Sequence, residues 1–285
     1  MERSIHFYIV ALDTFMVLVL QNENNTMFNQ YDWLKARVDI VIPAFNEEKR
    51  IEPVIKSIVS FIEENKPEWR LIIALDGDDR TEEIISKYMK MYNFIFISRS
   101  NSRSGKGSAI KRTANLVDSD FVILMDADGA ISFSTIVNYI RKGISSDITI
   151  FSRYLNSENN IPLHRMIISR GFNMLLKIIL GIDINDTQSG YKIIKTDLFR
   201  DALKNVSVTN TFFDVDLLYH LKKNGVTSEE IPTKYNHSEG SKFNPITEVI
   251  GQGVSLLAFR IRHSRIYKHI PPQMEKLYYA IFLYI

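Results

Sequence analysis

Short apolar runs alternate with longer amphipathic stretches along the first half of the chain. Apolar positions three or four residues apart in the stretches indicate helices, and the compact β-branched runs between them indicate strands. The runs are residues 38–42, 71–75, 94–98, 121–125 and 148–151, and the stretches are residues 47–64, 81–91, 108–116 and 135–142. Strands that alternate with helices in this way predict a mostly parallel, doubly wound α/β sheet.

The strands of this predicted sheet are buried on both faces. Residues 121–125 read FVILM and are apolar at every position, which is typical of an inner parallel strand. In open α/β sheets, ligands bind at the carboxyl ends of the strands. The residues that directly follow each apolar run are therefore the candidates for chemistry.

The alternation stops after residue 155. A long helical pattern over residues 163–180 comes next, and a helix at 213–223 and a strand at 227–235 follow it. No linker rich in Pro or Gly separates the two halves. We expect one α/β domain over residues 38–245, with a specialised second half.

Both ends of the chain are unusually apolar. Residues 4–20 carry few polar side chains, but a spanning helix needs about 20 apolar residues, and Asp13 in mid-span costs roughly 2.5–3.5 kcal/mol. A membrane anchor or interfacial helix is one interpretation, and a packed helix or a misassigned start is the other. Residues 249–285 mix basic and apolar side chains, as membrane-surface elements do, although a solvated helix that closes the domain fits equally. We expect residues 1–37 to form an anchor and linker, and residues 246–285 to form amphipathic helices at a membrane interface.

Composition excludes several classes of protein. The 35 Lys and Arg residues nearly balance the 33 Asp and Glu residues, and a nucleic-acid binder would show a clear basic excess. The chain has no cysteine, so disulfides, thiolate zinc sites, iron–sulfur clusters and cysteine nucleophiles are all excluded.

Two turns at predicted strand ends have both ordinary and functional interpretations. Pro43 ends the first strand, and Asn46 is placed to cap the helix predicted from Glu47. The same turn could present backbone N–H groups and a carboxylate to a nucleotide. The acidic turn that begins at Asp76 is of a kind that is usually only a turn.

Residues 99–107 (RSNSRSGKG) form a basic, glycine-containing loop at a predicted helix start. Such loops suit phosphate groups. The spacing is not that of the Walker motif, in which Gly-Lys-Ser/Thr follows a fixed gap.

Among the strand-end turns, the functional interpretation is favoured most for Asp126-Ala127-Asp128 at the end of the fourth strand. In extended chain the two aspartates face the same side, about 6.5–7 Å apart. They can share one cation with a diphosphate, because Mg²⁺ prefers one or two carboxylates together with substrate phosphates. The string ILMDADGA also resembles the motif of haloacid-dehalogenase-type phosphatases, with Asp126 as nucleophile and Asp128 as acid/base. That family begins its fold with this strand, whereas here three strand–helix units come first.

Together these segments resemble the family-2 glycosyltransferases of the GT-A fold. The resemblance rests on IVIPAFNEE, the Asp76 turn, GKG and DADG. Four later segments are similar to the dolichyl-phosphate β-glucosyltransferases: residues 151–155, 186–193, 213–225 and 230–245. One departure is Leu75-Asp76-Gly77-Asp78, where the family usually has Asp-Asp-Gly-Ser, so the nucleotide preference stays open.

The resemblance implies transfer of a hexose, glucose in the first instance, from a nucleotide sugar such as UDP-glucose to dolichyl or polyprenyl monophosphate. It implies inversion at the anomeric carbon and dependence on Mg²⁺ or Mn²⁺. It also implies association with membrane lipid, a catalytic domain on the cytoplasmic face and no nucleic-acid partner, and it leaves the oligomeric state open. An inactive GT-A domain that serves as a membrane scaffold is a further alternative, for which the Asp pair, the GKG loop or the arginines would have to be lost.

The resemblance also assigns roles to individual residues. Those that border the nucleotide sugar are Pro43, Phe45, Asn46, Glu47, Asp76 at the base, Lys106 near the phosphates, Asp126, Ala127 and Lys242. Asp126 and Asp128 hold the metal. Residues at the reacting groups are Asp128, Arg153, Arg165 and Ser169 for the acceptor phosphate, with Asp186 and Gln188 beside the donor sugar. Arg165 and Ser169 are four residues apart and so share one helix face.

Overall fold

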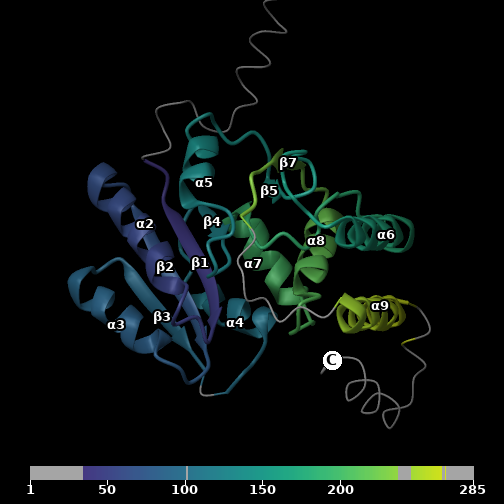
Figure 1. Ribbon diagram of the computed structural model, residues 1–285, viewed down its shortest axis with the longest axis horizontal. Helices are drawn as coiled ribbons and strands as arrows, with labels where there is room; N and C mark the ends of the chain where they lie inside the picture. The colour runs from purple at the N-terminus through teal and green to yellow at the C-terminus, as the bar shows by residue number, and fades with distance from the viewer. Residues whose placement is uncertain (1–34, 101, 237–244, 265–266, 268–285) are drawn as a thin grey trace, which may run out of the picture.

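The computed structural model describes residues 35–100, 102–236, 245–264 and 267, and all structural statements below concern these residues. A seven-stranded sheet lies at the centre, in the order β3-β2-β1-β4-β6-β5-β7 (Figure 1). The strands are β1 (Val38–Phe45), β2 (Trp69–Asp76), β3 (Ile95–Arg99), β4 (Phe121–Leu124), β5 (Ile148–Ser152), β6 (Lys192–Lys195) and β7 (Ser228–Pro232). The helices are α2 (Ile51–Asn65), α3 (Thr81–Met91), α4 (Lys106–Arg112), α5 (Phe133–Ile140), α6 (Leu163–Leu180), α7 (Thr196–Asn205), α8 (Phe213–Lys223) and α9 (Pro245–Arg262).

The sheet is parallel except where β6 enters it. β6 runs antiparallel to both of its neighbours, β4 and β5, while the other adjacent strand pairs are parallel. The mostly parallel α/β sheet predicted from the sequence is therefore confirmed. The sequence pattern did not reveal β6, because this strand has only four residues and carries a lysine at each end.

The first strand-to-helix connection differs from its prediction. Helix α2 begins at Ile51 instead of residue 47, and its N-cap is Arg50. Asn46 has a left-handed backbone with φ of 55°, and its side-chain oxygen accepts a hydrogen bond from the Asp78 N–H at 3.2 Å. The prediction that Asn46 caps the helix is wrong, because its amide instead joins the β1 turn to the β2 turn.

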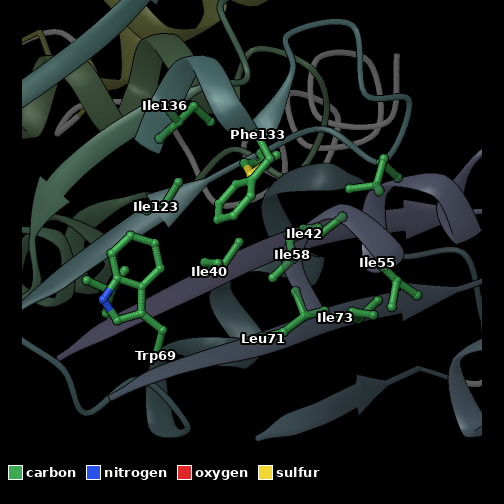
Figure 2. Packing of buried hydrophobic residues seen from close by; sticks show 14 of the residues in the cluster. Ile40, Ile42, Ile55, Ile58, Trp69, Leu71, Ile73, Ile123, Phe133 and Ile136 are labelled. Atoms are coloured by element: carbon green, nitrogen blue, oxygen red, sulfur yellow. The ribbon is translucent and has the colours of Figure 1, made fainter. Parts of the chain in front are cut away.

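Apolar side chains cover both faces of the sheet. On one face, residues from β1, β2 and β4 pack against α2, α3 and α5. Figure 2 shows this cluster, in which the Trp69 and Phe133 rings lie edge to face with centroids 6.3 Å apart. On the other face, Val41, Ile72 and Val122 pack with α4, α7, α8 and parts of α6 and α9. Burial on both faces explains why the inner strands are almost continuously apolar.

Within the described residues, no helix has the length and apolar character that crossing a bilayer requires. Of the predicted membrane segments, residues 1–37 and 246–285, the structure leaves 1–34, 265–266 and 268–285 outside its described part. The domain boundaries at residues 37 and 245 remain predictions.

Candidate active site

The predicted site residues gather at one edge of the sheet. Phe45 and Asp76 are register partners at the ends of β1 and β2, and β4 ends two residues before Asp126. Because β6 is antiparallel, the residues just before it, 186–191, return to this same edge. The topology thus brings the DTQSGYK segment to the Asp pair, although about 60 residues separate them along the chain.

Asp76 is the anchor of the basic loop. Its carboxylate is buried and accepts hydrogen bonds from the Ser104 N–H and hydroxyl, both at 2.7 Å. The Arg112 guanidinium donates to its other oxygen at 2.6 Å. These bonds fix residues 102–106 over the end of β2, beside the position where the resemblance expects a nucleotide base.

An exposed aromatic ring lies at the end of β1. Phe45 is 40% exposed, and the Arg103 guanidinium lies over its ring at 4.6 Å from the centroid. Such a cation–π pair between a strand end and the basic loop contributes about 0.5–1 kcal/mol at an exposed position. It offers two flat surfaces, one aromatic and one guanidinium, on which a base can stack.

Lys106 connects the GKG loop to the first aspartate of the pair. Its Nζ lies 3.2 Å from Asp126 Oδ1 and 2.9 Å from Asp214 Oδ2. Burial opposes the charge, but the two carboxylates outweigh burial and raise the pKa of Lys106 well above its ordinary value. Lys106 is therefore a permanent cation at the Asp pair.

The glycines on either side of Lys106 allow this placement. A Cβ at Gly105 would come within 2.4 Å of the Thr209 carbonyl oxygen, and one at Gly107 within 2.5 Å of the Val208 carbonyl oxygen. The GKG glycines thus pack closely against the segment that precedes α8. This close packing holds the loop in place and brings Lys106 next to Asp214.

Asp214 joins Lys106 to a second, fully buried lysine. Lys192 at the start of β6 is 0% exposed, and its Nζ donates to Asp214 Oδ1 at 2.6 Å. Burial disfavours the charged Asp214 carboxylate, yet the two lysines outweigh burial and lower its pKa. Burial and the Lys106 charge lower the pKa of Lys192, against the attraction of Asp214.

The second aspartate of the pair, Asp128, is held by Ala130 and by Tyr191, which directly precedes β6. Asp128 Oδ1 accepts hydrogen bonds from the Ala130 N–H at 3.0 Å and from the Tyr191 hydroxyl at 3.1 Å. Burial and the two aspartates raise the pKa of Tyr191, so it stays a neutral donor. At Gly190 a Cβ would lie 2.0 Å from the Asp126 carboxylate, so only glycine leaves room for that side chain.

Glu47 adds a third carboxylate near the Asp pair. Burial raises the pKa of Glu47, the Arg50 guanidinium at 2.6 Å lowers it, and the negative charges of Asp128 and Asp126 raise it further. The Arg50 guanidinium therefore holds the Glu47 carboxylate in place near the carboxylates of Asp126 and Asp128.

The Asp pair fits a divalent cation. Both hydrogen bonds to Asp128 fall on one oxygen, and the Asp126 side chain is 37% exposed, so a ligand can reach it. No group of three or more His, Cys, Asp or Glu side chains comes together as a metal site in the described part of the chain. Phosphate oxygens of a bound donor would have to complete the shell, which is the arrangement that Mg²⁺ favours.

Arg153 and Asp186 form one unit. The guanidinium donates to both carboxylate oxygens, at 2.9 Å and 2.7 Å, and the Arg153 N–H donates to the same carboxylate at 2.9 Å. Asp186 outweighs burial and raises the pKa of Arg153 further above its ordinary value. The rings of Tyr154 and Tyr235 lie 5.4 Å and 5.7 Å from the guanidinium. The family resemblance assigned Arg153 to the acceptor phosphate and Asp186 to the donor sugar, whereas the structure pairs these two side chains with each other.

Arg165 and Ser169 lie on α6, and Asn173 continues their face one turn further on. Asn173 donates to the Asn185 carbonyl oxygen at 2.5 Å and accepts from the Thr187 hydroxyl at 2.7 Å. This face of α6 is thereby tied to the loop that contains Asp186 and Gln188. Both Arg165 and Ser169 are partly buried.

The remaining predicted residues are distributed as follows. Pro43 lies within β1, which continues to Phe45, so the prediction that Pro43 ends the strand is wrong. Ala127 is buried, and Gln188 is partly exposed in the loop before β6. Lys242 lies outside the described residues.

Sequence reasoning missed the residues that support the site: Asp214, Lys192, Tyr191, Gly190, Arg112 and Asn173. Two of them left a signal, because a lysine next to the apolar run of β6 and an aspartate within an apolar helix start are costly to bury without a partner. The pairing of Lys192 with Asp214 left no signal in the sequence, because the two residues are far apart along the chain.

The comparison with known families decides what kind of site this is. The model of the glycosyl transferase family 2 matches residues 39–203. This chain belongs to glycosyl transferase family 2. It is a glycosyltransferase, and the phosphatase alternative built on Asp126 loses its basis.

Curated relatives show which group of enzymes within the family this chain resembles. The chain is 30% identical over 256 residues to the dolichyl-phosphate beta-glucosyltransferase ALG5D of Trichomonas vaginalis, covering 84% of this chain and 78% of that protein. It is 25% identical over 262 residues to the human dolichyl-phosphate beta-glucosyltransferase, covering 85% and 81%. The resemblance to this group of enzymes is confirmed.

Solved structures share the fold. Mannosyl-3-phosphoglycerate synthase from Rubrobacter xylanophilus has a TM-score of 0.57 at 14% identity and covers 86% of this chain and 81% of its own. Glucosyl-3-phosphoglycerate synthase from Mycobacterium tuberculosis, crystallised with Mn²⁺, UDP and glucosyl-3-phosphoglycerate, has a TM-score of 0.56 at 17% identity and covers 82% and 84%. These similarities support the GT-A-like fold.

Proposed function

We propose that this glycosyltransferase transfers glucose from UDP-glucose to dolichyl or another polyprenyl monophosphate, with the help of Mg²⁺ or Mn²⁺. Relatives named dolichyl-phosphate beta-glucosyltransferase support the acceptor and the sugar. A structural neighbour solved with Mn²⁺ and UDP supports the donor and the metal. The observation that carries the proposal is the pair Asp126 and Asp128, held by Lys106 and Tyr191 at the carboxyl edge of the sheet.

The donor half of the site is built from β1, β2, β4 and the basic loop. Phe45 and Arg103 would stack on the base, and Asp76 orients the loop above it. Lys106 provides a fixed positive charge for the diphosphate. A divalent cation bound by Asp126 and Asp128 would neutralise the charge that grows on the leaving phosphate oxygens.

The main task of the acceptor half is to position the acceptor phosphate, rather than to remove a proton from it. A monoester phosphate has a second pKa of about 6, so the nucleophile is already ionised near neutral pH and no strong general base is required. Asp186 holds the Arg153 guanidinium in one orientation, and α6 presents Arg165 and Ser169 one turn apart. These groups would hold the acceptor phosphate against the donor sugar, beside Asp186 and Gln188, and such placement lowers the barrier.

The remaining parts of the proposal concern location. A polyprenyl acceptor lies in a bilayer, so we expect the enzyme at the membrane with residues 38–245 as its catalytic domain on the cytoplasmic side. Residues 1–37 and 246–285 would assist this association.

The test is transfer of labelled sugar into organic-extractable lipid, scored over a panel of nucleotide sugars and divalent cations. UDP-glucose with polyprenyl phosphate should give the largest signal. Asp128→Asn should reduce it by at least about a hundredfold, because the cation loses a charged ligand. Asp118→Asn is the matched control, since Asp118 is 80% exposed and lies away from the site.

Two results would contradict the proposal. One is folded Asp128→Asn with full activity at saturating Mn²⁺, which would remove the metal assignment. The other is a folded, unaltered enzyme that glycosylates no lipid phosphate with any donor of the panel, which would favour the inactive scaffold.

A further inference from the structure

Helix α6 carries its apolar side chains on the outside of the molecule. Of its 18 residues only Leu176 is buried. Six large apolar side chains of α6 are exposed: Leu163 at 69%, Ile167 at 62%, Ile168 at 38%, Met174 at 64%, Leu175 at 47% and Ile178 at 68%. At about 100° per residue these positions fall within one arc of about 140°. The exposed apolar residues thus form a stripe along the helix, and the exposed His164 and Gly171 lie within the same arc.

The inner side of α6, which faces the protein, carries both polar and apolar side chains. Asn173 is hydrogen-bonded to the loop before β6, and the Phe172 ring packs against Phe212 with centroids 6.4 Å apart. Leu176 lies in the core cluster beside α8. The orientation of α6 is therefore fixed by specific contacts on its inner side, and the outward stripe is a feature of the fold.

Helix α9, next to α6, also exposes apolar side chains. It packs beside α6, and Figure 1 shows the two helices together at the end of the molecule opposite α3. Leu257 and Ile261 of α9 are 60% and 36% exposed, while Phe259 is buried. We call the six exposed apolar residues of α6, together with Leu257 and Ile261, the α6–α9 face. Contiguous apolar patches of this kind mark protein or membrane contacts.

Basic side chains border the α6–α9 face, and one of them, Lys177, is paired with the exposed Asp183 at 2.8 Å. Helix α6 contains no acidic residue, and the exposed Arg170 and Lys177 lie along one border of the apolar stripe. Arg260 is exposed on α9, and residues 251–262 of that helix also lack acidic side chains. An apolar stripe bordered by basic side chains is the pattern of helices that lie in the headgroup region of anionic bilayers.

We propose that the α6–α9 face docks on the surface of a bilayer that contains anionic lipid. The apolar stripe enters the boundary between headgroups and acyl chains, and Arg170 and Arg260 contact the headgroups. Arg165 and Ser169 lie on the opposite side of the same helix, so the site edge lies about 10–12 Å, one helix diameter, from the membrane. The docking does not depend on the proposed function, but its use, the delivery of a lipid phosphate to Arg165, rests on it.

The chain offers a direct probe because it contains no cysteine. Full-length Ile178→Cys is labelled with an environment-sensitive fluorophore, and Met91→Cys, on α3 and 62% exposed, is the matched control. With vesicles of phosphatidylcholine and phosphatidylserine, emission at position 178 should shift to the blue and be quenched by spin-labelled lipid. The label at position 91 should stay unchanged.

Three outcomes overturn the proposal. The protein could fail to bind these vesicles, or it could bind them while the label at position 178 stays in water. The label could also be shielded before any vesicle is added. Shielding that depends on protein concentration would assign the face to a second copy of the chain, and shielding that does not would assign it to residues outside the described part.

A second experiment separates docking from the reaction. The double variant Ile167→Glu/Ile178→Glu should transfer sugar to long-chain polyprenyl phosphate in vesicles at a rate lower by about tenfold or more. Transfer to a water-soluble, short-chain prenyl phosphate should be unchanged, and Met89→Glu/Met91→Glu should be normal with both. Equal loss with both acceptors would overturn docking as the cause. If the unaltered enzyme uses neither acceptor while position 178 still enters the bilayer, the proposed function fails and the docking stands.

Discussion

Helices α2 and α6 have similar patterns but opposite surroundings. Helix α2 buries six of its 15 residues, Ile51, Val54, Ile55, Ile58, Val59 and Ile62, against the sheet. Helix α6 is longer, yet it buries one residue and exposes six large apolar ones. Helix α2 belongs to the half that would bind the nucleotide, and α6 belongs to the half that would bind the acceptor. The difference teaches that amphipathicity predicts a helix but does not say which of its faces meets the protein.

The two halves also differ in the charges that they bury. In the first half, Asp39 is buried but its partner Arg70 is 33% exposed, with a bond of 2.7 Å between them. In the second half, Lys192 and Asp214 are both inside, at 0% and 4% exposed. A buried pair is costly to form, and it is most sensitive to loss of a single partner.

The largest expected effect comes from that buried pair. Asp214→Asn should lower the free energy of unfolding by about 3–5 kcal/mol, because the buried Lys192 loses its counter-charge and keeps only the Ser189 carbonyl as a partner. Asp39→Asn should cost clearly less, since Arg70 reaches solvent. Urea denaturation of both variants measures the difference. The double variant Asp214→Leu/Lys192→Met should recover part of the loss, and a double variant as unstable as Asp214→Asn would contradict this account.

The next effect tests the two helices directly. Ile55→Ala in α2 should lower the free energy of unfolding by about 2–5 kcal/mol, because it opens a cavity in the core. Ile167→Ala in α6 should change it by less than about 0.5 kcal/mol, as expected of a surface position. Thermal or urea unfolding without lipid gives both numbers. A large loss for Ile167→Ala would mean that the α6–α9 face is covered within the protein.

The smallest effect is a pH dependence where Asp147, just before β5, is paired with Lys195 of the second half. Lys195, at 2.7 Å, is the main cause that lowers the pKa of Asp147 to about 2, and hydrogen bonds from Thr227 add to it against burial. The stabilisation is present above the ordinary carboxyl pKa of about 4 and is lost as pH falls from there towards 2. It should amount to about 1 kcal/mol, since solvent screens the pair. Stability of Asp147→Asn should depend less on pH over this window, and an identical dependence would refute the assignment.

The alternating pattern predicted most of the fold, because each inner strand and its helix form a local unit. The Asp pair was predictable for the same reason, since it directly follows a buried strand. Strand β6 was not, because its partners β4 and β5 are set by the packing of the whole second half. The Arg153–Asp186 pair and the Lys106–Asp214 contact join residues up to 108 positions apart, and no single segment encodes such contacts.

The proposed site has a donor half that contains Lys106 and an acceptor half that contains Arg165. The most direct measurement sets donor affinity by calorimetry beside transfer kinetics at varied lipid phosphate, for Arg165→Ala and Lys106→Met. Arg165→Ala should lower transfer by about tenfold or more at unchanged donor affinity, because a charge-assisted bond to the acceptor is lost. Lys106→Met should weaken donor binding. If Arg165→Ala instead weakens donor binding and leaves the response to lipid phosphate unchanged, the division is contradicted.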